Sequence, residues 1–172
     1  MTLRPWHERD VPALVACAND PELARWLDTL PQPYTEQDAR DYVAHGVRGW
    51  SGEAPETTFA VVDAATDEPL ASCGIRWQEA EQGVAEIGYW TRREARGRGV
   101  ATRAVRLLAG WVLGELAYER LQLRADTGNV ASQRVAERAG FTREGVIRSA
   151  RTHSRDGRRI DFALYSLLRQ EL

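Results

Sequence analysis

Residues 85–102 read Ala85-Glu86-Ile87-Gly88-Tyr89-Trp90-Thr91-Arg92-Arg93-Glu94-Ala95-Arg96-Gly97-Arg98-Gly99-Val100-Ala101-Thr102. A β-prone segment is followed by a basic turn that contains Gly97 and Gly99, and then by the first residues of a long helix. Glycines in such a turn leave backbone N–H groups accessible, and the helix start adds unpaired N–H groups and the positive end of its dipole. The stretch therefore predicts a binding site for a phosphate or pyrophosphate group.

Spacing separates three kinds of phosphate-binding loop. A Walker loop requires G-x-x-x-x-G-K-[ST], but all 23 basic residues of this chain are arginine. A dinucleotide fingerprint requires G-x-G-x-x-G, and Thr102 stands where the third glycine is needed. The pattern [QR]-x-x-G-x-[GA] is matched by Arg96, Gly99 and Ala101, and it resembles the acyl-CoA pyrophosphate loop of the GNAT (GCN5-related) N-acetyltransferases.

A second segment strengthens this resemblance. Residues 126–145 contain Asn129-x-x-Ser132, then Gly140-Phe141 and Glu144-Gly145, and they resemble the N-x-x-S…G-F-x-x-E-G segment of the same family. The match is closest to the Rim-like branch, named for acetylation of ribosomal-protein amino termini. The opening Leu3-Arg4-Pro5-Trp6 resembles the same branch, so the resemblance covers nearly the whole chain.

The predicted elements indicate a mixed α/β domain. Apolar periodicity and turn residues predict strands over 2–6, 57–63, 70–78, 84–90, 121–125, 146–152 and 160–167. Helices are predicted over 10–18 with Asp10 as N-cap, and over 21–27, 35–47, 99–116 and 129–140. The resemblance implies the GNAT fold, an α/β (α+β) architecture with a mixed central sheet of six to seven strands, flanked by helices. It also implies a splay between the parallel strands 84–90 and 121–125.

Length and composition bound the protein class. With 172 residues, the chain suits a single domain over residues 1–172. No run of about 18 apolar residues and no secretory signal is present, so we expect a cytoplasmic protein without a membrane partner. Cys17 and Cys73 match no metal spacing, so we expect free thiols and no metal. The sequence pI of about 6.0 disfavours a nucleic-acid binder.

Charge is divided unevenly along the chain. Residues 1–91 contain 6 Arg and 16 acids, a net of −10, whereas residues 92–172 contain 17 Arg and 9 acids, a net of +8. An anionic cofactor suits the basic half and a cationic amine the acidic half. We expect the acceptor side to be lined by Asp28, Glu36, Asp38 and Asp41. The alternative is that both halves form solvated faces that mix on folding.

The resemblance implies acetyl-CoA, or another acyl-CoA, as co-substrate. Backbone groups of Trp90, Thr91 and Arg92 are expected to pair with the pantetheine amides. A backbone N–H at Trp90 or Thr91 is expected to donate to the thioester oxygen. The pyrophosphate is expected at Arg96, Gly97, Arg98, Gly99, Val100, Ala101 and Thr102.

Residues of the second motif have both a ligand-binding and a structural interpretation. Asn129 is expected at the pantetheine, but it also suits a helix N-cap. Arg134 or Arg138 is expected at the nucleotide phosphate, although the two could form a solvated i, i+4 pair. Ser132 stands where the family places a thiolate-protonating hydroxyl, with a tolerated surface residue as the alternative. Tyr165 on the last strand is a second acid candidate.

The general base is where the chain departs from its relatives. The resemblance places a base about seven residues after Glu144, at Arg151, which cannot serve. Glu86 on the central strand is the remaining acidic candidate, and the alternative is a structural carboxylate bonded to neighbouring strands. His153 and Asp161 on the final hairpin rank after it.

The missing carboxylate bears on the acceptor. At pH 7 a lysine amine of pKa about 10.4 is neutral in about one part in 10³, and an α-amine of pKa about 8 in roughly one part in ten. An α-amine therefore depends less on a general base than a lysine amine does. The resemblance implies an acyl-CoA-dependent N-acyltransferase, a monomer or homodimer, in which a peptide N-terminal α-amine or a small amine attacks directly in a ternary complex. A non-catalytic acyl-CoA-binding module and a small-molecule (antibiotic or polyamine) N-acetyltransferase are the alternatives.

Overall fold

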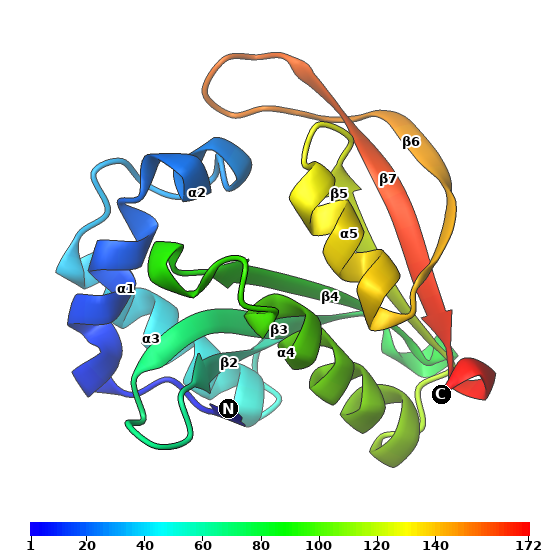
Figure 1. The fold of residues 1–172 in the computed structure, drawn as a ribbon, viewed down its shortest axis with the longest axis horizontal. Coiled ribbons are helices and arrows are strands. Elements are labelled where there is room, and N and C mark those ends of the chain that lie inside the picture. Colours follow the sequence, from blue (N-terminus) through cyan, green and yellow to red (C-terminus); the bar gives the residue numbers. More distant parts are fainter. The chain divides into compact units, whose positions relative to one another are not determined.

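The computed structural model describes residues 1–172, and all seven strands belong to one sheet (Figure 1). The strand order is β1-β2-β3-β4-β5-β7-β6. The strands are β1 (Thr2–Arg4), β2 (Glu56–Val62), β3 (Pro69–Glu79), β4 (Val84–Thr91), β5 (Arg120–Asp126), β6 (Thr142–Thr152) and β7 (Arg159–Leu168). The helices are α1 (Val11–Ala18), α2 (Pro21–Trp26), α3 (Glu36–Trp50), α4 (Val100–Ala109) and α5 (Val130–Ala139). None of the helices is long and apolar enough to cross a membrane.

The sheet is mixed, as predicted. β4 and β5 pair in parallel, whereas β1 with β2, β5 with β7 and β6 with β7 are antiparallel. The parallel register runs from Val84 opposite Arg120 to Glu86 opposite Gln122, and both strands continue beyond it. The splay that the sequence predicts between these strands is expected to begin there.

The chain divides into two compact units. The first unit contains residues 1–75 and 89–101, and the second contains residues 76–88 and 102–172. Because β3, β4 and α4 each contribute residues to both units, the chain passes between them within regular elements rather than through linkers. A single domain over residues 1–172 stays a prediction.

In the first unit, α3 packs against β2 and α1. A Cβ added at Gly49 would lie 1.8 Å from Glu56 O, and one added at Gly46 would lie 2.7 Å from Thr58 Oγ1. The two glycines therefore permit a close approach of helix to strand. The adjoining core consists of Trp6, Val11, Leu14, Ala18, Tyr34, Ala39, Ala60 and Val62.

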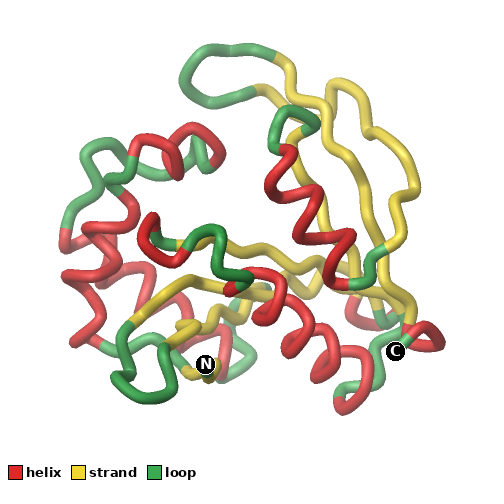
Figure 2. Tube along the Cα trace, in the orientation of Figure 1, coloured by secondary structure: helices red, strands yellow, loops and turns green.

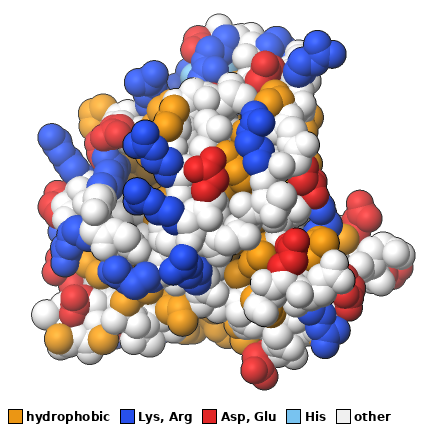
Figure 3. Space-filling model, turned by 45° about the vertical axis from the view of Figure 1, so that its right-hand side comes forward, with side chains coloured by type: hydrophobic (Ala, Val, Ile, Leu, Met, Phe, Trp, Pro, Cys, Tyr) orange, Lys and Arg blue, Asp and Glu red, His pale blue; other side chains and the backbone are white.

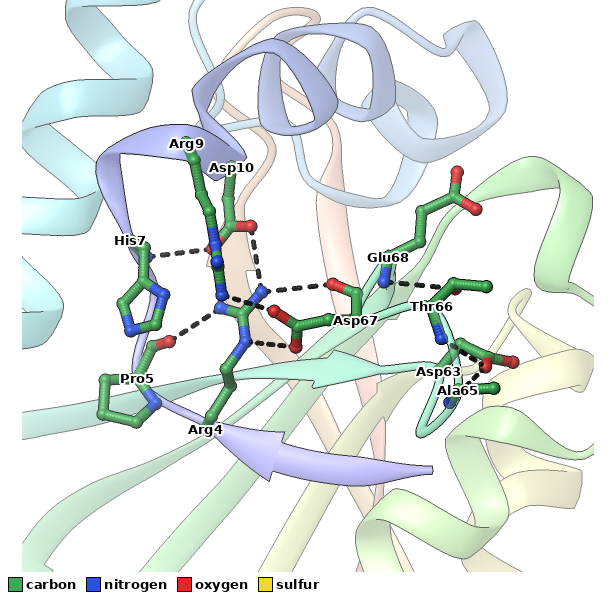
Figure 4. A network of polar contacts seen from close by, with 10 residues as sticks. All are labelled: Arg4, Pro5, His7, Arg9, Asp10, Asp63, Ala65, Thr66, Asp67 and Glu68. Atoms are coloured by element: carbon green, nitrogen blue, oxygen red, sulfur yellow. Dashed lines mark hydrogen bonds and ion pairs between the residues drawn. The ribbon is translucent and has the colours of Figure 1, made fainter.

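Arg4 connects the end of β1 to two carboxylates (Figure 4). It donates to Asp10 Oδ2 at 2.7 Å and to Asp67 Oδ1 at 2.8 Å. Asp10 also accepts from the backbone N–H of His7 at 2.9 Å, which closes the 3₁₀ turn before α1. Asp10 is the N-cap residue of α1, as predicted, but its side chain makes no capping hydrogen bond, because Arg4 and His7 occupy its carboxylate.

In the second unit, β6 and β7 form a long hairpin, and α5 packs against β5 and β6 (Figure 2). β6 begins at Thr142, four residues before its predicted start at Val146. The buried face of β5 consists of Leu121, Leu123 and Ala125, in the alternation that the sequence predicts.

The helix predicted over 99–116 changes character midway. It is α-helical to Ala109 and a π-helix from Gly110 to Glu115. Gly110 and Gly114 both lower the α-helical propensity of this segment. Within it, Trp111 lies edge-on to Trp77, with ring centroids 6.4 Å apart.

Candidate active site

The predicted phosphate loop follows β4 in the first unit. The chain makes a 3₁₀ turn over Arg93–Ala95, is extended at Arg96, and then passes through Gly97 and Gly99, whose φ angles are +71° and +74°. Such left-handed conformations favour glycine. A Cβ added at Gly97 would meet no atom within 4 Å, so the space beside this backbone is open. Because α4 begins at Val100, its unpaired N–H groups follow the loop directly.

The guanidinium of Arg96 is held within the first unit. Nε donates to the Thr91 carbonyl at 3.1 Å, and Nη1 donates to Glu22 Oε2 at 2.8 Å. Nη2 donates to Asp20 Oδ2 in a short contact. Its side chain is about one quarter exposed, at 26%. Arg96 therefore links the loop to the end of β4 and to the start of α2.

Arg92 is fixed in a similar way. Its guanidinium donates to Glu68 Oε1, to Glu94 Oε2 at 3.0 Å and to the Pro69 carbonyl at 3.2 Å. Arg93 and Arg98 are exposed. The exposed positive charge of the loop thus comes from Arg93 and Arg98 rather than from Arg92 and Arg96.

Trp90 is partly buried, and its side chain packs against the core of the first unit. Its ring stacks on Trp6 with centroids 5.9 Å apart, and Trp6 contacts Tyr42 edge-on. Val100 is also buried, at 2% exposure. For Trp90 and Val100, the group that could serve a ligand is therefore the backbone, as the sequence predicts for this stretch.

Glu86 lies in a polar network of the second unit. Arg124 Nη2 donates to Glu86 Oε1 at 2.9 Å, and Gln78 and Gln122 donate to Oε2 at 2.9 and 3.3 Å. Arg124 Nε lies 2.6 Å from Oε2 but outside hydrogen-bonding geometry, so this second approach is an ionic contact. The Glu86 side chain is 14% exposed. These contacts match the structural alternative and leave the proton-accepting role of Glu86 a prediction.

The N-terminus of α5 brings Asn129 and Ser132 together. Asn129 Oδ1 accepts from the Ser132 N–H at 3.0 Å, so Asn129 caps the helix. The turn before it is fixed by Asp126, whose carbonyl accepts from Asn129 N at 2.8 Å and whose carboxylate accepts from Gly128 N at 2.7 Å. Ser132 is half-buried in the first turn. Their contacts with a pantetheine stay predictions.

Tyr165 is buried on β7, and its hydroxyl donates to Glu137 Oε1 at 3.2 Å. Burial, followed by the nearby Glu137 carboxylate, raises the pKa of Tyr165, so this hydroxyl is protonated at neutral pH. Arg134 and Arg138 are exposed on α5, and the Arg138 carbonyl accepts from Arg106. A role for either arginine at a nucleotide phosphate stays a prediction.

The base candidates on the β6–β7 hairpin, His153 and Asp161, make contacts that stabilise the hairpin. His153 is buried, and its Nδ1 lies 2.7 Å from Asp156 Oδ1 in the connecting turn. Asp161 accepts from the Ser149 N–H at 2.7 Å, within the bulge of β6. Arg151 lies over the Phe162 ring at 5.8 Å. Each of these three contacts lies within the hairpin itself.

The sequence did not predict which residues pair with Glu86 and with Arg96. Arg124 and the two glutamines surround Glu86, and Asp20 holds Arg96. The alternation along 121–125 does predict that Gln122 and Arg124 lie on the same face of the strand, and this could have identified them as partners of Glu86. Nothing in the sequence indicated the pairing of Asp20 with Arg96.

Folding reduces the division of charge. The first unit contains 9 Arg and 14 acids, a net of −5, and the second contains 14 Arg and 11 acids, a net of +3. The basic loop is part of the acidic unit, and acidic side chains lie among the exposed arginines on the face drawn in Figure 3. The expected acceptor-side acids also have partners: Glu36 pairs with Arg40, Asp38 with Thr35, Asp41 with Gln37, and Asp28 is buried.

Comparison with known proteins identifies the family. Residues 1–142 match the family model described as "Acetyltransferase (GNAT) domain". The chain is 30% identical to the "Uncharacterized N-acetyltransferase p20" of Bacillus licheniformis over 171 residues, which is 99% of this chain and 94% of the relative.

Solved structures share the fold, two acetyltransferases of Vibrio species among them. The ribosomal-protein-S5-alanine acetyltransferase of Vibrio fischeri superposes with a TM-score of 0.82 at 20% identity, covering 98% of this chain and 93% of that one. The spermidine N-acetyltransferase of Vibrio cholerae, solved with CoA and spermine, gives 0.80 at 18% identity, covering 99% and 96%. The family match, the mixed seven-stranded sheet and the glycine loop agree, and the chain belongs to the GNAT family of N-acetyltransferases.

Proposed function

We propose that this chain transfers the acetyl group of acetyl-CoA to a peptide N-terminal α-amine. The observation that carries the proposal is the loop before α4, where Gly97 and Gly99 adopt left-handed conformations and the helix N-terminus follows. Backbone N–H groups in that arrangement suit a pyrophosphate, and the exposed Arg93 and Arg98 add positive charge. Acetyl-CoA, the donor used by GNAT enzymes, carries such a group.

The proposed reaction is direct acyl transfer in a ternary complex. The neutral amine attacks the thioester carbonyl, the oxygen becomes an oxyanion, and the C–S bond then breaks to release the CoA thiolate. A backbone N–H of Trp90 or Thr91 is the proposed oxyanion donor. Ser132 is the proposed acid for the thiolate, and the proton lost by the amine passes to Glu86 or to water.

The choice of an α-amine rests on the weakness of the available bases. Arg124, Gln78 and Gln122 occupy three of the roughly four acceptor positions of the Glu86 carboxylate, which leaves one position on Oε1 for a further proton. Arg151 occupies the other expected base position. An acceptor that is neutral in roughly one part in ten at pH 7 can react without a strong base, whereas a lysine or polyamine nitrogen depends on one.

A thiol-release assay with matched acceptors tests the proposal. One peptide has a free N-terminus and no lysine, a second has the same sequence with a blocked N-terminus and one lysine, and spermidine is the third acceptor. We expect CoA release with the first peptide and little with the others at pH 7. Faster release with spermidine would contradict the acceptor class. Tight CoA binding without release for any amine would instead indicate an acyl-CoA-binding module.

A further inference from the structure

Arg96 fills the first position of the loop motif, yet its guanidinium contacts the protein on three sides. Both of its ionic partners belong to the start of α2: Asp20 is the N-cap of this helix, and Glu22 lies in its first turn. The Asp20 side chain is only 11% exposed, and it also accepts from the Glu22 N–H at 3.1 Å. A partly buried pair of this kind is screened less than a surface pair.

Contacts within the protein engage all three nitrogens of the Arg96 guanidinium. A guanidinium offers five N–H donors in a fixed planar fork, and here Nε, Nη1 and Nη2 all donate to protein oxygens. A carboxylate beside an anion-binding loop would repel the ligand if it were not neutralised. The Arg96–Asp20 pair therefore both removes this repulsion and fixes the loop to α2.

We propose that Arg96 is a positioning residue of the acetyl-CoA site rather than a pyrophosphate ligand. It fixes the segment Arg96–Gly99 to the N-terminal turn of α2 and to the end of β4, so that the loop backbone is preorganised for the ligand. This inference rests on the proposed function. Its consequence is that CoA affinity depends on Asp20, which lies 76 positions away from Arg96 in the sequence.

Asp20→Asn gives opposite results for the two roles of Arg96. Asparagine is as good an N-cap as aspartate, so α2 keeps its cap while the ion pair is lost. If Arg96 were a pyrophosphate ligand, the substitution would release it and remove a negative charge, and CoA would bind more tightly. If Arg96 positions the loop, CoA should bind about tenfold more weakly by calorimetry, the effect of losing a charged hydrogen bond.

Glu68→Gln is the matched control. It removes one carboxylate that pairs with the neighbouring Arg92 and leaves the contacts of Arg96 in place. We expect unchanged or slightly tighter CoA binding, which measures the effect of charge alone. Arg96→Lys is a second variant, because lysine keeps the charge but cannot span three partners. We expect it to weaken CoA binding like Asp20→Asn, whereas a direct phosphate contact would be largely retained.

A truncated donor separates loop positioning from a general loss of folding. S-acetylpantetheine lacks the pyrophosphate, so its kcat/KM should be the same in wild type and in Asp20→Asn. With acetyl-CoA, KM should rise and kcat at saturation should stay the same. Equal losses with both donors, or CoA binding in Asp20→Asn that is as tight as in Glu68→Gln, would overturn the inference. The proposed function fails separately, if the wild type binds no CoA or releases none.

Discussion

Arg124 Nη2 donates to Glu86 Oε1 at 2.9 Å, so the candidate base on β4 is ion-paired with a residue of β5. In the parallel register Glu86 lies opposite Gln122, and Arg124 lies two residues further along on the same face. The carboxylate is held in one place by this pair and by Gln78 and Gln122. The contribution of Glu86 to turnover should therefore depend on the pKa of the acceptor amine.

Glu86→Gln should affect basic acceptors most. With an amine of pKa about 10 we expect turnover at pH 7 to fall at least about tenfold, and with an amine of pKa about 8 less than about twofold. The loss should shrink as pH rises, because more of the amine is then neutral without help. Steady-state rates with the two amines at several pH values measure this. Equal losses for both amines at every pH would show that Glu86 is structural.

Gly97 tests whether the conformation of the loop decides CoA affinity. Its φ of +71° suits glycine, is tolerated by asparagine and is strained for a β-branched residue. Because an added Cβ meets no protein atom within 4 Å, Gly97→Asn and Gly97→Val differ mainly in backbone strain. Calorimetry should show CoA binding at least about tenfold weaker in Gly97→Val than in Gly97→Asn. CoA affinity unchanged in both folded variants would argue against a pyrophosphate at this loop.

Local chemistry explains why much of the fold could be predicted from the sequence. The capping box of Thr35 and Asp38, the left-handed Gly140 that ends α5, and the alternation in β5 all depend on neighbouring residues, and all are present. Asp10 is the N-cap of α1 as predicted, but its carboxylate does not bond to the helix, because Arg4 and the His7 N–H occupy it. The change to a π-helix at Gly110 was missed because the predicted apolar stripe assumes α-helical periodicity over the whole segment.

The candidate site divides in the same way. The left-handed Gly97 and Gly99 follow from the residue type, and the cap formed by Asn129 follows from its place before a helix. The partners of Arg96 and Glu86 could not be predicted from the sequence. Arg96 pairs with Glu22, 74 positions away, and Glu86 pairs with Arg124, 38 positions away. Many other charged side chains of the chain could form such pairs equally well. What sequence reasoning lacked was therefore the register and packing that select one partner for each charge.

Gly49→Ala should destabilise the first unit. The new Cβ would lie 1.8 Å from the Glu56 carbonyl oxygen, and backbone on both sides must then separate. We expect a loss of about 3 kcal/mol or more in the free energy of unfolding, as for other overpacked sites. Gly110→Ala is the control: its Cβ meets no atom within 4 Å, so stability should be unchanged or slightly higher. Urea unfolding of both variants measures the difference, and equal stabilities would contradict the close packing of α3 on β2.

Glu144 should make the β5–β7–β6 part of the sheet sensitive to acid. Hydrogen bonds from Arg120 and then from Ser166 lower the pKa of Glu144 from 4.5 to about 2. Because the folded pKa is depressed, this stabilisation is present above about pH 4.5 and is lost as pH falls toward 2. The Glu144 side chain is 37% exposed, so solvent screening limits the contribution to on the order of 1 kcal/mol.

The corresponding variant is Glu144→Gln. At neutral pH it should be less stable than wild type by on the order of 1 kcal/mol, and the two free energies of unfolding should converge near pH 2. Glu119→Gln, which removes a carboxylate paired with Arg169 at 3.2 Å and 66% exposed, should differ little from wild type at any pH. A Glu144→Gln difference that is the same at pH 7 and near pH 2 would exclude ionisation as its source.

The expected acceptor-side acids lead to the last prediction, on the salt dependence of catalysis. The division of −10 and +8 along the sequence becomes −5 and +3 between the folded units, because the arginine-rich loop belongs to the acidic unit. Glu36 pairs with Arg40 at 2.9 Å, Asp38 closes a capping box, and Asp41 accepts from Gln37 at 2.9 Å. Only Glu36 has a cationic partner, so Asp38 and Asp41 keep their full charge. The net charge of the first unit is nevertheless half that of residues 1–91, and its field is screened over about 8 Å at physiological salt.

We therefore compare kcat/KM at low salt and at about 0.5 M salt, where the Debye length is only a few ångströms. Between these two conditions, kcat/KM for a cationic peptide should fall by no more than about three times the factor seen for a neutral peptide. Joint neutralisation of Glu36, Asp38 and Asp41 to the corresponding amides should leave both salt profiles, and CoA affinity, nearly unchanged. Asparagine at position 38 can still accept from the Thr35 N–H, so the capping box is not the variable. A tenfold steeper fall for the cationic peptide that disappears in the triple variant would show that these carboxylates steer the acceptor in spite of their partners, and a cationic acceptor would then be the better assignment.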